Sequence, residues 1–425
     1  MIPRSLNLNL RGLPQSATLS INQRSIALQR EGRTVYRFGL GQSPFPVPDP
    51  VVAALAEHAA EKDYLPVEGL PALREAVADF HRRLDGASVS AEGVLIGPGS
   101  KELMFLAQLA FYGDLVVPTP CWVSYGPQAR IIGRAVKTIP TTREERWRLS
   151  GARLAEHCSG DPGRPRLLIL NYPGNPDGDS YSEVELAALA EAAREHGVIV
   201  LSDEIYGLTH HAGEHRSIAR YYPEGTIISG GLSKWCGAGG WRVGTFAFPE
   251  PLYWLRDAIA AAASETYTSV SAPVQYAAVT AFRGGPTIED YLTHSRRVLG
   301  ALGVEITRRL RAAGVRLQDP VGAFYLWLDF EGLADRLAER GVTDSATLCG
   351  RLLAEAGVAI LPGVSFERPP EELTARLAYV DFDGGVALAE SRAVPLDEPL
   401  PAEALERCCG KVLAGIDALC GWLRG

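Results

Sequence analysis

The chain has 425 residues, which is more than one hydrophobic core usually holds, so we expect two domains. Hydrophobic residues make up 46% and charged residues 22% of the chain, which is typical of a globular protein and excludes a disordered one. Acidic residues outnumber basic ones by 50 to 42, whereas a nucleic-acid-binding protein would carry a basic surface. No apolar run approaches the ~18 residues of a membrane-spanning helix, and the polar N-terminus predicts no signal peptide.

The cysteines and histidines argue against disulfide bonds and a metal site. The seven cysteines are odd in number and include no C-x-x-C pair, which favours reduced thiols in a cytoplasmic protein. His210, His211 and His215 cluster without a cysteine partner or an HExxH helix, so we interpret them as part of a solvated loop. We therefore expect no bound metal.

The predicted elements begin with a helix over residues 19–31, which ends at Gly32. Short buried strands then alternate with helices at 94–96, 115–117, 167–170, 198–201, 227–228 and 245–248. The best-defined helix begins at Ser182, which forms a capping box with Glu185, and ends at Gly197. This alternation predicts an α/β fold with a mostly parallel central sheet flanked by helices.

The two ends of the chain have a different pattern. A long charged helix is expected over residues 296–313, followed by an aromatic strand over 323–329, and residues 390–403 are predicted to form an exposed loop. We expect the ends to join in space as one smaller α+β domain. The expected division is residues 1–62 and 296–425 for the small domain, and 63–295 for the large one.

Residues that directly follow the strands are the candidates for a binding site, because ligands of open parallel sheets bind at the carboxyl ends of the strands. Gly99, Ser100 and Lys101 follow the first strand and begin a helix. Free N–H groups at a helix N-terminus bind phosphate, although such a pattern is more often only a turn. Trp122 follows the second strand and either stacks on a flat ligand or covers the core.

The later strands are followed by polar residues of several kinds. Asn175 lies in a Pro- and Asn-rich turn, and Asp203 with Tyr206 follows the next strand. A carboxylate in that position is partly buried and needs a partner. Ser233 and Lys234 come after the following strand, in a segment of glycines and tryptophans that suits a surface lysine poorly.

Together these groups match one cofactor. Pyridoxal 5′-phosphate needs a carboxylate at its ring nitrogen, hydroxyl or amide donors at its phenolic oxygen, an amine for its aldehyde and an anion site for its phosphate. Asp203 would supply the carboxylate, Tyr206 and Asn175 the donors to the phenolic oxygen, and Lys234 the amine. The anion site for the phosphate would come from the segment Gly99-Ser100-Lys101 with Arg242.

On these residues the chain resembles the class I aminotransferases, which are pyridoxal-phosphate enzymes of fold type I. The similar segments are Asn175-Pro176, residues 203–206, and Ser233-Lys234 with Arg242 eight residues later. Weaker similarities lie at Tyr64, at Gly39-Leu40-Gly41 and in the segment that begins with Arg376, so that the match runs from about residue 16 to 382. Two positions depart from the family: Asp177 stands where Thr is usual, and Gly231 offers no hydroxyl where some members have Ser.

The resemblance implies a role for each matching residue. Lys234 would hold the cofactor as an aldimine and act as general base and acid. Asp203 would pair with the pyridine nitrogen, Tyr206 and Asn175 would bind the ring oxygen, and Trp122 would stack on the ring. Arg376 would bind the substrate carboxylate beside Gly41 and Asn175. The residues expected on the phosphate side are Gly99, Ser100, Lys101, Ser233, Arg242 and, from the second subunit of a homodimer, Tyr64.

The resemblance also implies the reaction, which is transfer of an amino group from an L-amino acid to a 2-oxo acid. Aspartate or glutamate is the first choice because residues 16–22 resemble the bacterial aspartate aminotransferase branch. In that branch a Thr at the position of Thr18 and a Lys at that of Lys101 help to bind a second carboxylate. Glu265 would instead favour a cationic side chain if it faced the site. Elimination, cyclisation or oxidation on the same fold stays open as an alternative.

Overall fold

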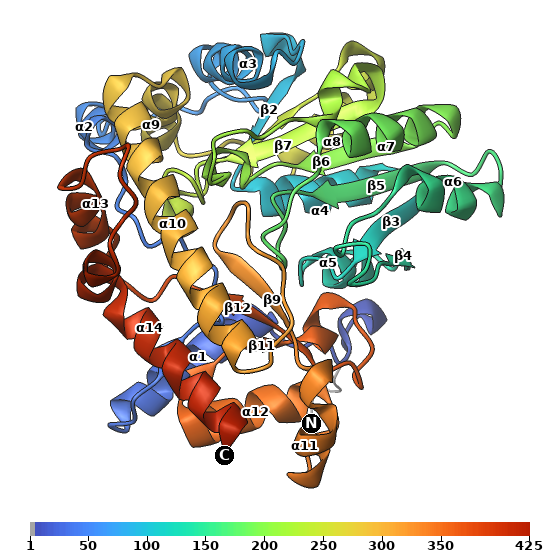
Figure 1. Cartoon of the computed structure of the whole chain (residues 1–425). Coiled ribbons are helices and arrows are strands. Elements are labelled where there is room, and N and C mark those ends of the chain that lie inside the picture. Colours follow the sequence, from blue (N-terminus) through green and yellow to red (C-terminus); the bar gives the residue numbers. More distant parts are fainter. Residues whose placement is uncertain (1–4) are drawn as a thin grey trace.

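The computed structural model describes residues 5–425, so residues 1–4 of the predicted N-terminal segment lie outside the described residues. A seven-stranded sheet with strand order β2-β8-β7-β6-β5-β3-β4 forms the largest layer (Figure 1). The bounds of its strands are β2 (Val94–Gly97), β3 (Asp114–Thr119), β4 (Val136–Pro140), β5 (Arg166–Asn171), β6 (Ile199–Asp203), β7 (Thr226–Gly231) and β8 (Gly244–Ala247).

The predicted α/β fold with a mostly parallel sheet is confirmed. The neighbours from β4 to β7 pair in parallel, and only β8 runs antiparallel to its neighbours β2 and β7. Helices cover both faces, since side chains along β5 alternate between two hydrophobic clusters: Leu167 and Ile169 belong to one, and Leu168 and Leu170 to the other. The strand β4, which is largely exposed, was not predicted.

The helices of the first part of the chain precede, connect or follow these strands, and α4 to α7 are the connecting ones. The helix α7 begins directly after Ser182 and has the predicted capping box with Glu185, so this prediction is confirmed. The helices are α1 (Ala17–Arg30), α2 (Asp49–Glu57), α3 (Pro71–Asp85), α4 (Ser100–Ala110), α5 (Tyr125–Ile131), α6 (Gly151–Ser159), α7 (Glu183–Glu195), α8 (Tyr253–Ser264) and α9 (Ala272–Arg283).

A second group of elements comes from both ends of the chain. The strands β9 (Tyr325–Asp329), β11 (Leu361–Pro362) and β12 (Thr374–Ala378) form an antiparallel sheet, while β1 (Tyr36–Arg37) pairs with β10 (Val358–Ala359). The helix α1 lies near α12 (Ser345–Ala356) (Figure 1), and Ile21 and Leu28 of α1 pack in one cluster with Leu353 of α12. The segments thus meet in space, and the exact domain boundaries stay a prediction. The helices here are α10 (Pro286–Ala312), α11 (Ala334–Glu339), α12 (Ser345–Ala356), α13 (Gly384–Arg392) and α14 (Ala402–Arg424).

Three predictions are wrong in part: two concern the C-terminal segments, and one concerns His215. The helix α10 begins ten residues earlier than expected, because Pro286 occupies its first position and its buried face already starts at Ile288. The predicted loop 390–403 is shorter, since α13 continues to residue 392 and α14 begins at residue 402. His215 does not lie on a solvated loop: it is buried, with its Nε2 2.9 Å from Oε2 of Glu204.

Two further observations concern residues 5–425 alone. No helix in this range is both long and apolar enough to cross a membrane. Nor do three His, Cys, Asp or Glu side chains of this range come together as metal ligands.

Candidate active site

A cavity of about 550 Å³ lies where the carboxyl ends of the parallel strands face the smaller antiparallel sheet. Asn171 ends β5, Asp203 ends β6 and Lys234 follows β7, while Arg376 of β12 lines the opposite side. The position is the one expected for a ligand site of an open parallel sheet. The cavity therefore depends on both sheets, whose strands are far apart in the sequence.

The structure brings most of the predicted site residues together in this cavity. Gly99 does not line the cavity, but it directly precedes Ser100, which does. Tyr64 does not line the cavity either, and 89% of its surface is exposed. Glu265 is exposed at the end of α8 and does not line the cavity. The predicted residues that line it are Thr18, Gly41, Ser100, Lys101, Trp122, Asn175, Asp203, Tyr206, Ser233, Lys234, Arg242 and Arg376.

The amine of Lys234 lies inside the cavity and donates a hydrogen bond to the carbonyl oxygen of Gly41, 2.7 Å away. Burial, together with the charge of Arg376, lowers the pKa of Lys234 from 10.5 to about 8, while Asp203 opposes the change. At pH 7 about a tenth of the Lys234 amine is therefore uncharged, far more than for an exposed lysine. This makes it a nucleophile for a carbonyl group and a group that can both take and give a proton.

Asp203 presents one free carboxylate oxygen to the cavity. Its Oδ2 accepts a hydrogen bond of 2.8 Å from the hydroxyl of Tyr125, at the start of α5. Its Oδ1 is buried and has no hydrogen-bond partner among residues 5–425. Burial raises the pKa of Asp203 to about 6, and the Tyr125 hydrogen bond limits this rise. A protonated ring nitrogen at Oδ1 would satisfy this oxygen, which fits the pyridine ring of pyridoxal phosphate.

Tyr125 was not among the predicted site residues. The sequence contains one signal for it: it follows Trp122 by three residues, in the segment after the second predicted strand. A buried carboxylate needs a donor, but only the tertiary structure shows that Tyr125 reaches the end of β6, since β5 separates β3 from β6 in the sheet.

Arg376 is a buried cation without a carboxylate partner among the described residues. It is 1% exposed, and its Nη1 donates to Oδ1 of Asn175 at 3.0 Å, while its Nη2 donates to the carbonyl oxygen of Gly39. Its guanidinium lies over the rings of Tyr325 and Phe366 at 4.8 and 5.2 Å. A buried charge that is not neutralised by the protein requires an anionic ligand, so Arg376 fits a carboxylate of the substrate.

A second anion-binding region lies at the start of α4. The guanidinium of Arg242 donates to the carbonyl oxygens of Pro98 and Gly239 at 3.1 and 3.0 Å. A Cβ on Gly99 would lie 2.1 Å from Nη2 of Arg242, so only glycine allows this approach. The free N–H groups of α4 and the charge of Arg242 thus meet beside Ser100, an arrangement that suits a phosphate.

Lys101 lies between this region and the N-terminal segment. Its Nζ lies 5.1 Å from the ring centre of Trp122, and burial lowers its pKa, with a further contribution from the charge of Arg242. Thr18 lines the same cavity from the second residue of α1, and its Oγ1 is 2.9 Å from Oγ of Ser16. The two residues provide a cation and a hydroxyl away from Lys234.

The structure explains one of the two departures from the family pattern, Gly231, and places the other, Asp177, outside the cavity. Gly231 has φ of 149°, and a Cβ there would lie 2.6 Å from the carbonyl oxygen of Val243, so no serine fits. Asp177 does not line the cavity. Burial raises its pKa to about 8, which makes this carboxyl group mostly neutral at pH 7.

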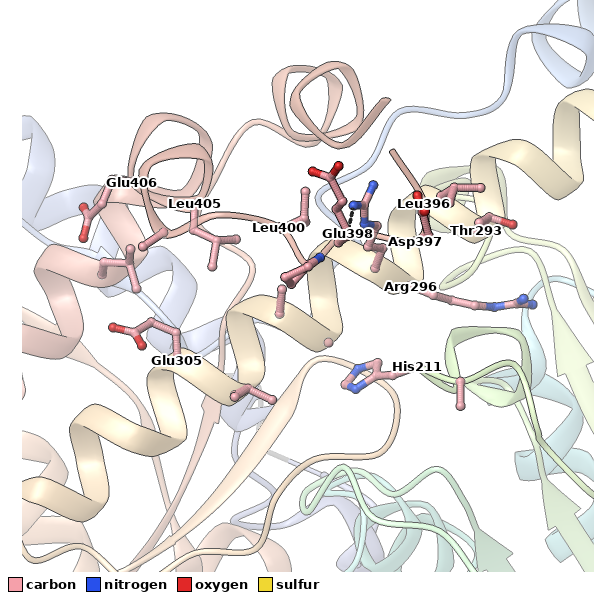
Figure 2. Close-up of a pocket in the computed structure, with 18 of the residues that line it drawn as sticks. His211, Thr293, Arg296, Glu305, Leu396, Asp397, Glu398, Leu400, Leu405 and Glu406 are labelled. Atoms are coloured by element: carbon pink, nitrogen blue, oxygen red, sulfur yellow. Dashed lines mark hydrogen bonds between the residues drawn. The ribbon is translucent and has the colours of Figure 1, made fainter. Parts of the chain in front are cut away.

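A larger cavity, of about 860 Å³, contains none of the predicted site residues (Figure 2). It lies between α10 and the segment that leads into α14. Arg297 donates to backbone carbonyl groups of residues 391–398, and Arg309 is paired with three carboxylates. Both cations therefore hold α10 to the C-terminal part of the chain and do not face a ligand.

Comparisons with known proteins agree with this geometry. A family model described as aminotransferase class I and II matches residues 33–379. The aspartate/prephenate aminotransferase of Thermus thermophilus is 31% identical over 368 residues, which cover 85% of this chain and 92% of that protein. The aspartate aminotransferase of Geobacillus stearothermophilus is 30% identical over 377 residues, which cover 86% and 92%. The solved structure of aspartate aminotransferase from Thermus thermophilus with maleate has a TM-score of 0.82 at 30% identity, and covers 92% of this chain and 98% of that one.

The lowered pKa of Lys234 leads to a prediction about its reactivity. In protein stripped of any bound cofactor, reductive alkylation of Lys234 by a small aldehyde should rise with pH around a midpoint near 8, because only the uncharged amine reacts. Peptide mass spectrometry across a pH series measures this, with the exposed Lys62 as internal control. Equal pH profiles for the two lysines would contradict the prediction.

Proposed function

The chain belongs to the class I and II aminotransferases, pyridoxal-phosphate-dependent enzymes of fold type I, and from this premise we propose that its amino donor is aspartate or glutamate. The acceptor would be a 2-oxo acid. One observation carries the choice of a dicarboxylic substrate: the cavity has Arg376 on one side and Lys101 with Thr18 on another. Of the four cations that line the cavity, Lys234 and Arg242 are proposed to hold the cofactor, which leaves Arg376 and Lys101 for a ligand with two carboxylates. Two similar proteins are named aspartate aminotransferases, and one was solved with maleate, a dicarboxylate.

The cofactor, when bound, supplies an electron-withdrawing ring that stabilises negative charge at the substrate Cα. We propose that Lys234 holds it covalently and later moves a proton at the substrate Cα, a task that its pKa of about 8 suits. Asp203 would accept a hydrogen bond from the ring nitrogen through Oδ1, its unpaired oxygen. Tyr206 and Asn175 would donate to the ring oxygen.

The remaining residues would position the cofactor and the substrate. Trp122 is proposed to lie against the ring, and Arg376 to bind the substrate α-carboxylate with Gly41 and Asn175 nearby. The buried site excludes water from these charges, which strengthens their interaction with the ligand. The phosphate would be bound by Gly99, Ser100, Ser233, Arg242 and, from the second subunit, Tyr64.

The first experiment separates transamination from the other reactions of this fold. We expect aspartate alone to convert the lysine-linked cofactor to its aminated form, seen as a loss of the long-wavelength absorption band, without release of ammonia. Addition of a 2-oxo acid should restore the band. Lys234→Ala should lack the band from the start while keeping its thermal unfolding transition. Release of ammonia with a regenerated band would instead indicate elimination or oxidation.

The second prediction concerns the distal carboxylate. Lys101→Met should lower the second-order rate of the half-reaction with aspartate by about tenfold or more, because a hydrogen bond to a charged group is lost. The rate with alanine, which has no second carboxylate, should change little. Lys137→Met is the matched control, since Lys137 is exposed on β4 and does not line the cavity. An equal loss with aspartate and alanine would reject this role of Lys101.

We also propose a cytoplasmic homodimer with shared active sites. All seven cysteines are free, which is usual in a reducing compartment. Tyr64 is exposed and does not line the cavity of its own chain, as expected for a residue that completes the site of a second subunit.

Mixed dimers test the shared site. Lys234→Ala and Tyr64→Ala subunits, each of low activity alone, should regain activity on mixing, because one of the two sites in a mixed dimer is then intact. Mixing Lys234→Ala with Arg242→Ala is the control and should restore nothing, since both residues belong to one chain's cavity. An active monomer in sedimentation, or no recovery in the first mixture, would reject the proposal.

A further inference from the structure

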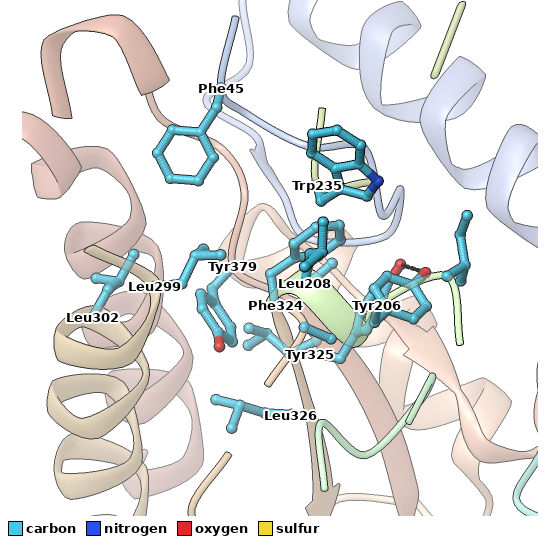
Figure 3. Close-up of a cluster of buried hydrophobic side chains, with 14 of the residues drawn as sticks. Phe45, Tyr206, Leu208, Trp235, Leu299, Leu302, Phe324, Tyr325, Leu326 and Tyr379 are labelled. Carbon is cyan, nitrogen blue, oxygen red and sulfur yellow. Dashed lines mark hydrogen bonds between the residues drawn. The ribbon is translucent and has the colours of Figure 1, made fainter. Parts of the chain in front are cut away.

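Tyr206 and Tyr325 form a pair of buried hydroxyl groups in the wall of the cavity. Their oxygens are 2.8 Å apart, and their rings meet edge to face at 83° with centroids 5.5 Å apart. Phe324 also packs edge to face against Tyr206, with centroids 5.7 Å apart (Figure 3). Two aromatic rings therefore fix the Tyr206 ring, and Tyr325 is the hydrogen-bond partner of its hydroxyl.

The direction of this hydrogen bond decides which hydroxyl can donate to a ligand. Burial raises the pKa of Tyr206 well above 10 and also raises that of Tyr325, so both phenols are neutral at physiological pH. Each phenol has one proton. The donor of the pair has used its proton, whereas the acceptor keeps its proton for another group.

The surroundings of Tyr325 favour its role as the donor. A Cβ on Gly41 would lie 1.9 Å from the Tyr325 oxygen, so the backbone of Gly41 packs directly against it. The cation of Arg376, which offers no acceptor, lies over the Tyr325 ring. Among the described residues, the Tyr206 oxygen is the hydrogen-bond partner of the Tyr325 hydroxyl. Tyr206 itself lies beside Lys234, whose Nζ is 5.5 Å from its ring centre.

We propose that Tyr325 is a positioning residue that donates its proton to Tyr206, so that Tyr206 keeps its own proton for the phenolic oxygen of the cofactor. The inference rests on the proposed function, which places that oxygen beside Tyr206. A hydroxyl that accepts one hydrogen bond is also a stronger donor, by about 10–30% per bond. Tyr325 thus orients and strengthens the Tyr206 hydrogen bond without touching the cofactor.

This arrangement has a consequence that absorbance can measure. When the cofactor is bound, the protonated nitrogen that joins it to Lys234 would be a second donor to the same ring oxygen. A strong hydrogen bond from Tyr206 competes for this oxygen, so the nitrogen loses its proton at lower pH. Loss of the Tyr325 hydroxyl weakens the competition and raises the pH at which the absorbance of the bound cofactor titrates.

The experiment titrates the absorbance of the holoenzyme for the wild type, Tyr325→Phe, Tyr206→Phe and the double variant. We expect Tyr325→Phe to raise the midpoint by about 0.5 pH unit, and Tyr206→Phe to raise it more. In the Tyr206→Phe background, Tyr325→Phe should add no further shift, because its effect passes through Tyr206. A purely structural role of Tyr325 would not produce this dependence.

Tyr379→Phe is the matched control. Its hydroxyl is buried in the same cluster and has no hydrogen-bond partner in the described part of the chain, so its loss should leave the midpoint unchanged (Figure 3). Thermal unfolding of both variants checks the fold. Tyr325→Met, which also lacks the hydroxyl, should shift the midpoint in the same direction and serves if Tyr325→Phe does not fold.

An unchanged or lowered midpoint in Tyr325→Phe would overturn the proposal. A lowered midpoint is the result of the opposite bond direction, since loss of Tyr325 would then free the Tyr206 proton for the cofactor. A shift that persists in the Tyr206→Phe background would overturn it as well. All these outcomes leave the transamination proposal standing, which fails only if the wild type is not aminated by an amino acid.

Discussion

The buried charge of Arg376 is the constraint on which the rest of the site depends. A guanidinium that is 1% exposed costs several kcal/mol unless its donors are satisfied and an anion lies nearby. The protein supplies oxygen acceptors from Asn175 and Gly39 and two aromatic faces, but residues 5–425 provide no carboxylate partner. The carboxylate of a substrate completes this set, so the same feature that costs stability in the empty site favours binding.

Arg376 also connects segments that are distant in the sequence. It lies on β12, and its hydrogen bonds reach the turn after β5 and the N-terminal segment before Gly41. The carbonyl of Gly41 in turn accepts a hydrogen bond from Lys234, which follows the central strand β7. The two sheets are thus joined at the point where the chemistry is proposed, and displacement of either one would change the environment of Lys234.

The burial that holds these groups also prepares their protonation states. Burial and the charge of Arg376 keep the pKa of Lys234 near 8, so that its amine reacts at physiological pH. Burial raises the pKa of Asp203 to about 6, and the hydroxyl of Tyr125 prevents a larger rise. Asp203 is therefore mostly ionised at pH 7 and can hold a proton on a ring nitrogen.

Local patterns in the sequence predicted every strand of the central sheet except β4, and the helix after Ser182, since side-chain periodicity and capping depend on neighbouring residues only. They also indicated where the polar residues would lie, because the residues after parallel strands meet at one edge of the sheet. The charged pattern that predicts α10 starts only at Arg296, so it does not reveal the first turns of the helix, for which Pro286 is the start signal.

Which residues complete the site depends on the tertiary packing. Tyr125 and Tyr325 have no local pattern that points to Asp203 or Tyr206; their hydroxyls reach these partners because β3, β6 and β9 are brought together by sheet order and packing. Burial, and with it the pKa of Lys234, is likewise a property of the packed chain. The sequence by itself determined the kinds of chemical groups and their order, whereas distances, hydrogen-bond partners and protonation follow from long-range contacts that no local spacing encodes.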